Sequence, residues 1–477
     1  MVIDDSSGKM SLTGAGGGFA IVVFGAGREH WQDTRNKLKS NPRKENRTVA
    51  LSCRSLDMNC LTSKCIRRIL TVTTTLLLSE TLSAAGFYIT EIGTPGSLGT
   101  AGVANPTNTY GADSSWTNPA GMTGLQHDTI VGGMQLILPK MEFDSTVATS
   151  GGSDGGNAGN PVVAPSLFYV KKLSDDLRFG FSVAGIQGGG VDYGEDFVGR
   201  YSVSKAELGA VGLSPSLGYR VNERFSVGAG VSVIYTRFDE DIMINRPLTS
   251  VDGKVKIEKA TDWGYQPFLG LTYALSEHAL LGLVYRAEMD VELEGDVKTR
   301  YLSLATDTVN IDWDNPQTLE AGLRFRLDDK NTMFLNAGWE EWSVFSTNTL
   351  EFSEGRINPS TTLERNFDNT WHAGIAFVHL EGDHGTSIGF SYDSSPVDDR
   401  DRTLDLPFDE FYKVSMAYGW RGGKQLDFSV GGTLYLMGDA KVDQTSPDLP
   451  GIPGTRVVGE FDTNMILFLG ATARYRF

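Results

Sequence analysis

Residues 281–294 read LGLVYRAEMDVELE, and the pattern of this stretch indicates the fold class. Its odd positions from Leu281 to Leu293 are apolar, whereas its even positions are mostly glycine or charged residues. Side chains of a β-strand point alternately to two faces, so the pattern predicts a strand between an apolar and a polar environment. Strands of soluble proteins average about 5–6 residues. A strand as long as this one therefore indicates a membrane-spanning β-barrel.

The same alternation recurs along the rest of the chain. The predicted strands cover residues 127–139, 164–172, 177–188, 206–220, 225–238, 263–275, 279–296, 316–327, 331–351, 370–380, 385–394, 411–420, 425–437 and 462–477. Six of the connections are short and seven are long, and the two kinds alternate throughout. Outer-membrane barrels have short periplasmic turns, long outer loops and an even number of strands. We therefore expect an all-β protein with a 14-stranded antiparallel transmembrane β-barrel over residues 127–477 in the cell outer membrane.

The final predicted strand has the features expected of a strand that closes such a barrel. Its odd residues from Met465 to Phe477 are apolar, and it ends on an aromatic residue. No stretch of the chain approaches the roughly 20 consecutive apolar residues that a spanning helix needs. The sequence thus excludes a helical membrane protein.

A secretory signal is predicted unusually far into the chain. Basic residues precede the apolar run at 69–78, and small residues follow it at 83–85. This order is typical of a signal peptide. Starting at Met58 gives a signal of ordinary length, so we assign 58–84 to the signal peptide and 1–57 to an over-extended start outside the mature protein.

The content of cysteine and of charged residues changes at the predicted cleavage point. All three cysteines (Cys53, Cys60 and Cys65) precede the predicted cleavage point, as suits a chain that enters an oxidising compartment. Residues 1–84 hold 12 Lys and Arg and 7 Asp and Glu, which leaves 30 basic and 52 acidic residues beyond them, a net charge of −22. So acidic a chain without a basic cluster is not expected to bind nucleic acid.

Residues 85–126 lack the strand pattern. They are rich in glycine and proline, with short apolar stretches between the turns. Because fourteen strands enclose more space than side chains fill, we expect this segment to lie in the lumen as a plug.

Short blocks throughout the mature chain resemble the FadL-type transporters of long-chain fatty acids and aromatic hydrocarbons. The blocks are AGF (85–87), NPAG (118–121), APS (164–166), YVK (169–171), GRY (199–201), PSLGYR (215–220), DWGY (262–265), WEEWS (339–343) and YDSSPV (392–397). Each block alone is weak, but together they occur in order over most of the mature chain. The resemblance implies a plugged monomer that takes up hydrophobic molecules by diffusion. No cofactor is expected, and no metal, because the mature chain has no cysteine and no paired histidine spacing. Long-chain fatty acids are the first expected substrate and monoaromatic hydrocarbons the alternative. The expected partners are outer-membrane lipid, lipopolysaccharide and the barrel-assembly machinery.

In the family, ligand passes from the outer loops to a deeper pocket near the N-terminus and leaves sideways beside a kinked third strand. The resemblance therefore assigns Phe87 to the ligand pocket and Asn118, Pro119 and Ala120 to the contact between plug and kinked strand. The third strand runs into Gly188, Gly189 and Gly190, and consecutive glycines weaken strand pairing, so they are candidates for the lateral gap. The alternatives are a frayed terminus for Phe87, an ordinary turn for Asn118, Pro119 and Ala120, and a glycine-rich loop for the three glycines.

A carboxylate ligand needs a basic side chain near its pocket. Arg200 and Lys205 are the first candidates, and Lys254 and Lys256 in the third outer loop come second, although most loop charges only face solvent. Trp339 and Trp342 are interpreted as part of an aromatic girdle at the membrane interface, with a place in the lining of the lumen as the alternative.

Other function classes have weaker support. Residues 151–155 read GGSDG and match G-x-S-x-G, but a nucleophile elbow needs a preceding strand and a following helix, whereas this match lies in a polar loop. We therefore expect no enzyme, with an outer-membrane lipase as the distant alternative. A glycine-rich stretch near the start lacks the context of a nucleotide site. An adhesin or purely structural barrel would lack the plug blocks.

Overall fold

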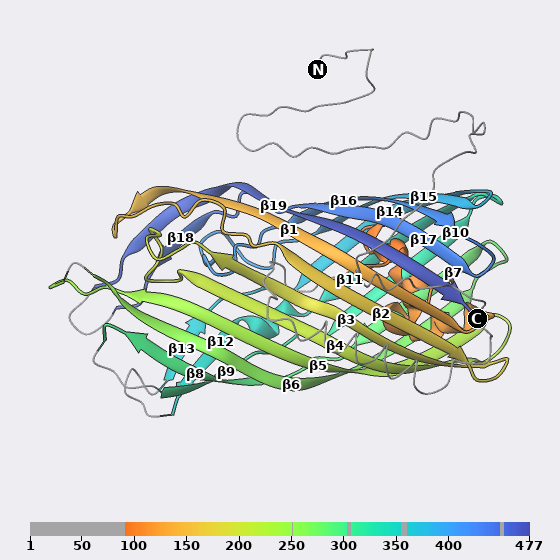
Figure 1. Cartoon of the computed structure of the whole chain (residues 1–477), viewed down its shortest axis with the longest axis horizontal. Coiled ribbons are helices and arrows are strands. Elements are labelled where there is room, and N and C mark those ends of the chain that lie inside the picture. Colours follow the sequence, from red (N-terminus) through yellow and green to blue (C-terminus); the bar gives the residue numbers. More distant parts are fainter. Residues whose placement is uncertain (1–90, 250, 303–306, 354–359, 449–452) are drawn as a thin grey trace, which may run out of the picture. The chain divides into compact units, whose positions relative to one another are not determined.

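Long antiparallel strands and tight turns dominate the chain after residue 128 (Figure 1). In this computed structural model, the strands of the barrel wall are β1 (Thr129–Ala148), β2 (Val162–Lys172), β3 (Leu177–Asp192), β4 (Lys205–Arg220), β5 (Phe225–Ile244), β6 (Gly253–Ala274), β7 (Ala279–Arg286), β10 (Thr318–Arg326), β11 (Asn331–Glu340), β14 (Thr370–Glu381), β15 (His384–Asp393), β16 (Phe411–Arg421), β17 (Leu426–Leu436) and β19 (Arg456–Arg476). The first and last pair along almost their whole length, from Thr129 with Arg476 to Ala148 with Val457, which closes the barrel. The predicted 14-stranded architecture is confirmed.

The structure describes residues 91–477 except 250, 303–306, 354–359 and 449–452. The predicted over-extended start, signal peptide and Phe87 lie outside these residues and stay predictions. Among the described residues, no helix is long and apolar enough to cross a membrane.

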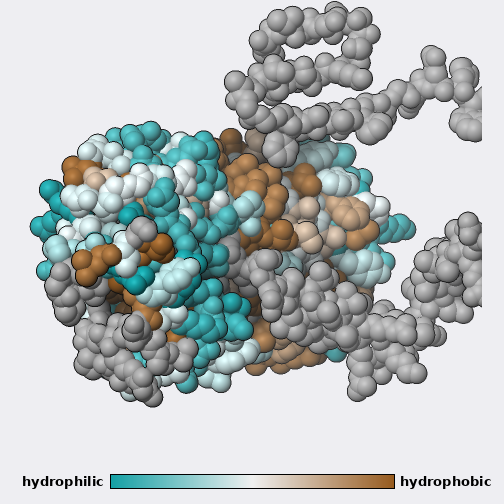
Figure 2. All heavy atoms as spheres, turned by 60° about the vertical axis from the view of Figure 1, so that its left-hand side comes forward, coloured by the Kyte–Doolittle hydropathy of each residue, from teal (hydrophilic) through white to brown (hydrophobic). Residues whose placement is uncertain are grey.

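Outward-facing side chains form an apolar belt around the wall (Figure 2). Met416 and Leu269 are 67% and 55% exposed on this surface, whereas their chain neighbours Ser415 and Phe268 face inward and are buried. Tyr235 and Trp263 form an aromatic pair on adjacent strands of the belt, with ring centroids 5.1 Å apart. Such an alternation is what a wall between lipid and lumen requires.

Five further strands lengthen the barrel at the end of the long loops (Figure 1). They are β8 (Glu292–Arg300), β9 (Asp307–Asp312), β12 (Thr347–Phe352), β13 (Ser360–Glu364) and β18 (Val442–Thr445). We call this part the outer extension, because outer-membrane barrels have their long loops outside. The opposite end carries the short turns.

Two predicted strands were too long. The prediction of one strand over 279–296 was wrong, because β7 ends at Arg286 and β8 begins at Glu292. Tyr285 faces outward and is 36% exposed, whereas Val291 and Leu293 are at most 4% exposed and pack into the core. The apolar face turns inward beyond Ala287 since the outer extension meets no lipid there.

The predicted strand 331–351 is interrupted by the 3-10 helix η3 (Trp342–Phe345). Trp339 faces outward at the end of β11, as a girdle residue would. Trp342 is buried instead, and its Nε1 donates a hydrogen bond to Glu340 Oε2 at 2.7 Å. Only Trp339 therefore has the place expected of a girdle residue.

Residues 91–126 form what we call the inner segment, which lies inside the barrel toward the short-turn end (Figure 1). It contains α2 (Pro95–Leu98), α3 (Ser114–Thr117) and the 3-10 helices η1 (Asn105–Thr107) and η2 (Pro119–Gly124). Contacts with β3 to β7 hold one side of it, and contacts of α2 with β16, β17 and β19 hold the other. Nearly all of its side chains whose burial is described are buried.

Candidate functional site

Asn118 fastens the inner segment to the barrel wall. Its Nδ2 donates to the carbonyl oxygen of Pro106 at 2.6 Å and to that of Leu271 on β6 at 3.1 Å. Its Oδ1 accepts a hydrogen bond from the backbone N–H of Ala120 at 3.1 Å. One amide thus caps η2 and joins two parts of the inner segment to a wall strand.

Glycines of three wall strands make room for the signature Asn118-Pro119-Ala120. A Cβ on Gly270 would overlap Asn118 Oδ1, and one on Gly228 would overlap the Ala120 backbone nitrogen. A Cβ on Gly218 would likewise overlap the carbonyl oxygen of Pro119. The signature was predicted to set the plug against the kinked third strand; its glycine contacts are with β4, β5 and β6, and η2, which begins at Pro119, also contacts β3.

A charged cluster holds the beginning of the inner segment. Lys413 Nζ on β16 lies 2.6 Å from Asp393 Oδ2 on β15 and 3.7 Å from Glu91 Oε1. The Tyr435 hydroxyl donates to Glu91 Oε2, and Lys413 lies over the Tyr435 ring. Both Glu91 and Lys413 are buried, so each needs the other charges to offset its lost hydration.

The pairing of β3 with its two neighbours is unequal. Its ladder with β4 runs from Leu177 to Asp192, with a register shift between Gly185 and Gln187. Its ladder with β2 stops at the pair Leu167 and Val183. Between Ala184 and Val191, β3 therefore pairs with β4 only, and at its end the Asp192 N–H donates to the Ala158 carbonyl oxygen in the β1–β2 connection at 2.9 Å.

The predicted glycine run lies in this part of β3. Gly189 and Gly190 line a small cavity of about 30 Å³ whose walls are mostly apolar. The other lining residues are Met141, Val191, Ala206, Glu207, Leu208, Phe238, Trp313, Asp405, Leu406, Pro407 and Phe408. We call this space the inner pocket.

A larger cavity of about 550 Å³ opens within the outer extension. Apolar side chains form much of its surface, including Ile242 and Met243 of β5, Val255 of β6, and Leu350 and Phe352 of β12. We call it the outer cleft. A concave, largely apolar surface is the usual form of a small-molecule site. Most residues that line this cleft are polar or charged, among them Glu240, Arg365 and Asp405.

A buried ion pair lies in the wall of the outer cleft. Arg365 Nη2 and Asp405 Oδ2 are 2.8 Å apart, and the same guanidinium donates to Asn348 Oδ1 and Thr403 Oγ1. Burial opposes the charge of Asp405, but Arg365 outweighs this effect and holds the pKa of Asp405 below its usual value. Burial and the nearby Asp405 charge raise the pKa of Glu240 to about 8. At neutral pH Glu240 is therefore mostly uncharged and does not repel an anionic ligand.

The four predicted basic residues lie at the long-loop end of the barrel, Arg200 before β4, Lys205 at the start of β4, and Lys254 and Lys256 on β6, and none lines the outer cleft or the inner pocket. Each is paired with a carboxylate: Arg200 with Asp252 at 2.8 Å, Lys205 with Glu207 at 2.7 Å, Lys254 with Asp241 at 2.6 Å, and Lys256 with Glu258 at 3.0 Å. Their assignment to a ligand stays a prediction.

Apart from Gly189 and Gly190, sequence reasoning missed the residues that line the two cavities. The run Lys254-Val255-Lys256-Ile257 alternates, and its apolar members line the outer cleft, whereas its lysines do not. This alternation of apolar and charged residues, within a segment that was predicted to be a loop, was the signal that could have identified the lining residues. Phe238 and Trp313, which meet with ring centroids 5.4 Å apart, carried no local signal because Trp313 lies far along the chain.

Ser153 of the G-x-S-x-G match lies in the connection between β1 and β2. Its backbone forms an isolated bridge with Phe197, and no helix follows it before β2. A nucleophile elbow needs that helix, so this serine lacks the required geometry. Among the described residues, no cluster of three or more His, Cys, Asp or Glu side chains is arranged to hold a metal ion.

Residues 75–477 match the family described as outer membrane protein transport protein (OMPP1/FadL/TodX). The chain belongs to the OMPP1/FadL/TodX family. The family match covers the barrel and the inner segment, and together with the closed wall it places this member in the outer membrane as a multi-pass β-barrel.

Named relatives of this OMPP1/FadL/TodX protein are transport and outer membrane proteins. The chain is 21% identical to the long-chain fatty acid transport protein of Salmonella typhi over 398 residues, which cover 76% of this chain and 90% of that protein. It is 22% identical to outer membrane protein P1 of Haemophilus influenzae over 417 residues, which cover 75% and 90%.

Two solved structures of the family share the fold. A FadL homologue of Pseudomonas aeruginosa has a TM-score of 0.74 at 18% identity and covers 82% of this chain and 100% of its own. The toluene transporter TodX of Pseudomonas putida has a TM-score of 0.61 at 16% identity and covers 83% and 99%.

Proposed function

We propose that this protein is a channel for the passive uptake of hydrophobic molecules, with long-chain fatty acids as the first substrate. A named relative transports long-chain fatty acids. The apolar part of the outer cleft provides a surface on which such a molecule would shed its hydration shell.

The observation that carries the proposal is the interrupted pairing between β2 and β3. Beyond Leu167 and Val183 the two strands form no ladder, and Gly189 and Gly190 of the unpaired half line the inner pocket. In a closed barrel, an unpaired stretch of wall is the place where the strands separate at least cost, since no interstrand hydrogen bond has to break. Ligand would pass from the outer cleft to the inner pocket and leave sideways between these strands.

In this account, the inner segment plugs the barrel. Residues 85–126 would form the plug of the mature protein after removal of a signal peptide at 58–84. Extensive contacts with both sides of the wall support a fixed position for the described part of this segment. Water-soluble molecules would then be excluded while hydrophobic ones use the lateral route. The barrel would act as a monomer after insertion by the barrel-assembly machinery, among outer-membrane lipid and lipopolysaccharide.

Monoaromatic hydrocarbons are the second candidate substrate, since a structural neighbour is a toluene transporter. The outer cleft offers both apolar surface and arginines. Arg365, Arg400 and Arg402 line it, and each is paired with an aspartate, at 2.8, 3.0 and 2.6 Å, so a carboxylate would compete with these partners, whereas toluene would not.

The test is to identify what the purified barrel carries. The protein is extracted in a mild detergent, and the bound species are analysed by mass spectrometry. Long-chain fatty acids above the level found with a small outer-membrane barrel prepared in the same way would support the proposal. Aromatic compounds would favour the alternative, and phospholipase activity abolished by Ser153→Ala would contradict the assignment as a channel.

A further inference from the structure

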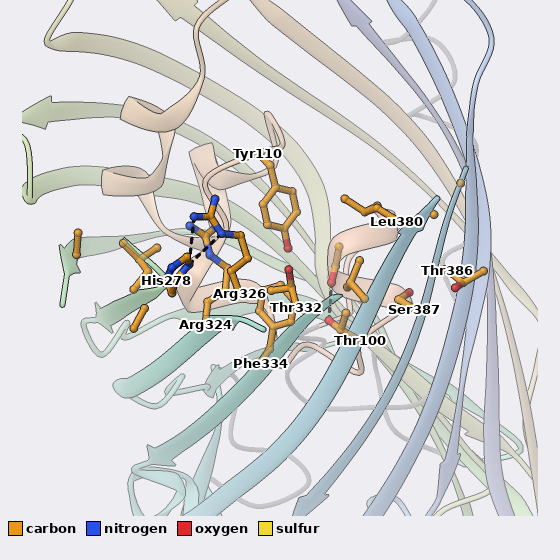
Figure 3. A pocket seen from close by; sticks show the side chains of 18 of the residues that line it. Thr100, Tyr110, His278, Arg324, Arg326, Thr332, Phe334, Leu380, Thr386 and Ser387 are labelled. Atoms are coloured by element: carbon orange, nitrogen blue, oxygen red, sulfur yellow. Dashed lines mark hydrogen bonds between the residues drawn. The ribbon is translucent and has the colours of Figure 1, made fainter. Parts of the chain in front are cut away.

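A third cavity lies at the short-turn end of the barrel, between the inner segment and strands β7, β10, β11 and β14 to β16 (Figure 3). Its volume is about 620 Å³, within the range of about 300–1,000 Å³ that is usual for small-molecule sites. Turn residues Ser276, Glu277 and His278 form its rim. We call it the lower chamber.

One wall of the lower chamber is apolar. Leu280, Phe334, Val378 and Leu380 face it from neighbouring strands of the barrel. Phe334 also packs with Val103, Ala104 and Ala376 into a small buried cluster that joins the inner segment to this wall. An acyl chain that lies along this surface would remove apolar area from water.

Three arginines line the same chamber. Arg474 is neutralised by Asp427, with nitrogen–oxygen distances of 2.8 and 2.5 Å. Arg324 and Arg326 form no ion pair with any carboxylate of the described residues. Figure 3 shows both side chains on one side of the chamber, below Tyr110.

The hydrogen bonds of these two arginines leave much of each guanidinium available. Arg324 uses only Nη1, which donates to Thr109 Oγ1 at 2.6 Å and to the Thr107 carbonyl oxygen at 3.3 Å. Arg326 donates from Nε to His278 Nδ1 and from Nη2 to the Glu277 carbonyl oxygen, each at 3.3 Å. A guanidinium has five N–H donors, so each retains donors for an anion.

We propose that the lower chamber is a second binding site, for an amphiphile whose carboxylate binds Arg324 and Arg326 and whose acyl chain lies against Phe334, Val378 and Leu380. Arginine suits a carboxylate because its planar fork can donate two parallel hydrogen bonds. A neutral hydrocarbon would leave both charges without a counter-ion. This inference rests on the proposed function and deepens it, because it places a fatty acid anion on the side of the inner segment away from the outer cleft.

The test is photocrosslinking of the full barrel in phosphatidylcholine nanodiscs. The probe is palmitate with a diazirine on the carbon chain close to the carboxyl end, and mass spectrometry locates the labelled residues. We expect label on Phe334, Val378 or Leu380 that unlabelled palmitate displaces and hexadecanol does not. Phe377 and Ile388 face outward and report nonspecific labelling from the lipid phase.

Variants separate the charge from the cavity. The double variant Arg324→Gln/Arg326→Gln should lower the displaceable chamber label about tenfold or more, since it removes charge-assisted hydrogen bonds. Arg324→Lys/Arg326→Lys keeps the charge and should retain most of it. Arg224→Gln is the matched control, because Arg224 is exposed in the turn between β4 and β5 at the same end. Heat-modifiable migration in gels verifies that each variant is folded.

Two results would overturn the proposal: chamber label that hexadecanol displaces as well as palmitate does, or chamber label that survives the double glutamine substitution. If the outer cleft is labelled at Met243 or Leu350 and the chamber is not, only the second site fails. If palmitate displaces no label anywhere inside the barrel, the proposed uptake of fatty acids fails as well.

Discussion

Lys413 joins the start of the inner segment to the barrel wall. It lies 2.6 Å from Asp393 of the wall and 3.7 Å from Glu91 of the inner segment, and its side chain is 5% exposed. We expect Lys413→Met to release the start of the inner segment, because removing one partner of a buried ion pair costs about 3–5 kcal/mol. Single-channel recording in planar bilayers should show higher conductance.

The control for this substitution is Lys330→Met. Lys330 also forms a 3.0 Å ion pair, with Glu381, but both side chains are more than half exposed. Exposed pairs contribute about 0–1 kcal/mol, so its conductance should equal that of the unsubstituted protein. Equal conductance for both variants would show that the charged cluster does not fasten the segment.

Glu240 should make stability depend on pH. Burial and the neighbouring Asp405 raise the pKa of Glu240 from 4.5 to about 8 in the folded protein, with Asp241 adding to the effect and Arg365 opposing it. Between these values the folded state binds more protons than the unfolded state, so stability from this group is present at low pH and lost as pH rises toward 8. Glu240→Gln should therefore raise the thermal midpoint more at pH 9 than at pH 5, measured by circular dichroism in detergent. Glu223→Gln, at an exposed turn, should show no such difference.

At this scale, sequence reasoning found the residues that fasten the inner segment better than those that line the cavities. Asn118 was selected from a short block, and the structure shows its amide joined to Leu271. Arg200 and Lys254 were selected for charge alone, and each is paired with a carboxylate. Charge is visible in a sequence, but a counter-ion from another loop is not.

Glycines of the wall strands leave the room that Asn118 and its neighbours occupy. We expect Gly270→Ala to displace the inner segment and reduce uptake, because the added Cβ would overlap Asn118 Oδ1. Gly132→Ala is the control, since a Cβ there meets nothing within 4 Å. Limited proteolysis of the folded barrel should cleave the inner segment in the first variant and not in the second. Protection of the segment in both would contradict a tight seat on β6.

The unpaired half of β3 can be tested by locking it to β2. The Ala164 Cβ lies 3.8 Å from the position of a Cβ on Gly185, close to the usual Cβ–Cβ distance of about 3.8 Å in disulfides. We expect oxidised Ala164→Cys/Gly185→Cys to lose fatty acid uptake and to regain it with a reductant. The single variants should transport normally under both conditions. Full uptake with the disulfide formed would exclude a lateral exit at this position.

The strands could be predicted where the surroundings of their two faces stay the same along the strand, and less well where those surroundings change. Side chains of the wall alternate between lipid and lumen along each strand, so their pattern is local. The alternation over 281–294 continues across the end of β7, but the apolar side turns from lipid to core between Tyr285 and Val291. That reversal depends on the surrounding outer extension, which no local pattern reports.

At the scale of the whole molecule, strand number and loop alternation followed from the sequence because both are sums of local features. The outer cleft and the lower chamber did not. Each is lined by strands and loops that are distant in sequence, as Ile242 and Thr445 of the outer cleft show. Their existence depends on how the closed barrel brings these parts together and on where the inner segment leaves space.

Uptake of a radiolabelled long-chain fatty acid tests the central claim most directly. The protein is produced in a Gram-negative host that lacks its own transporter for these acids, and cell-associated oleate is measured against toluene uptake in the same strain. The account predicts that the protein restores oleate uptake and that the oxidised Ala164→Cys/Gly185→Cys barrel does not. Oleate uptake no higher than in the empty host, with the barrel correctly inserted, would contradict it.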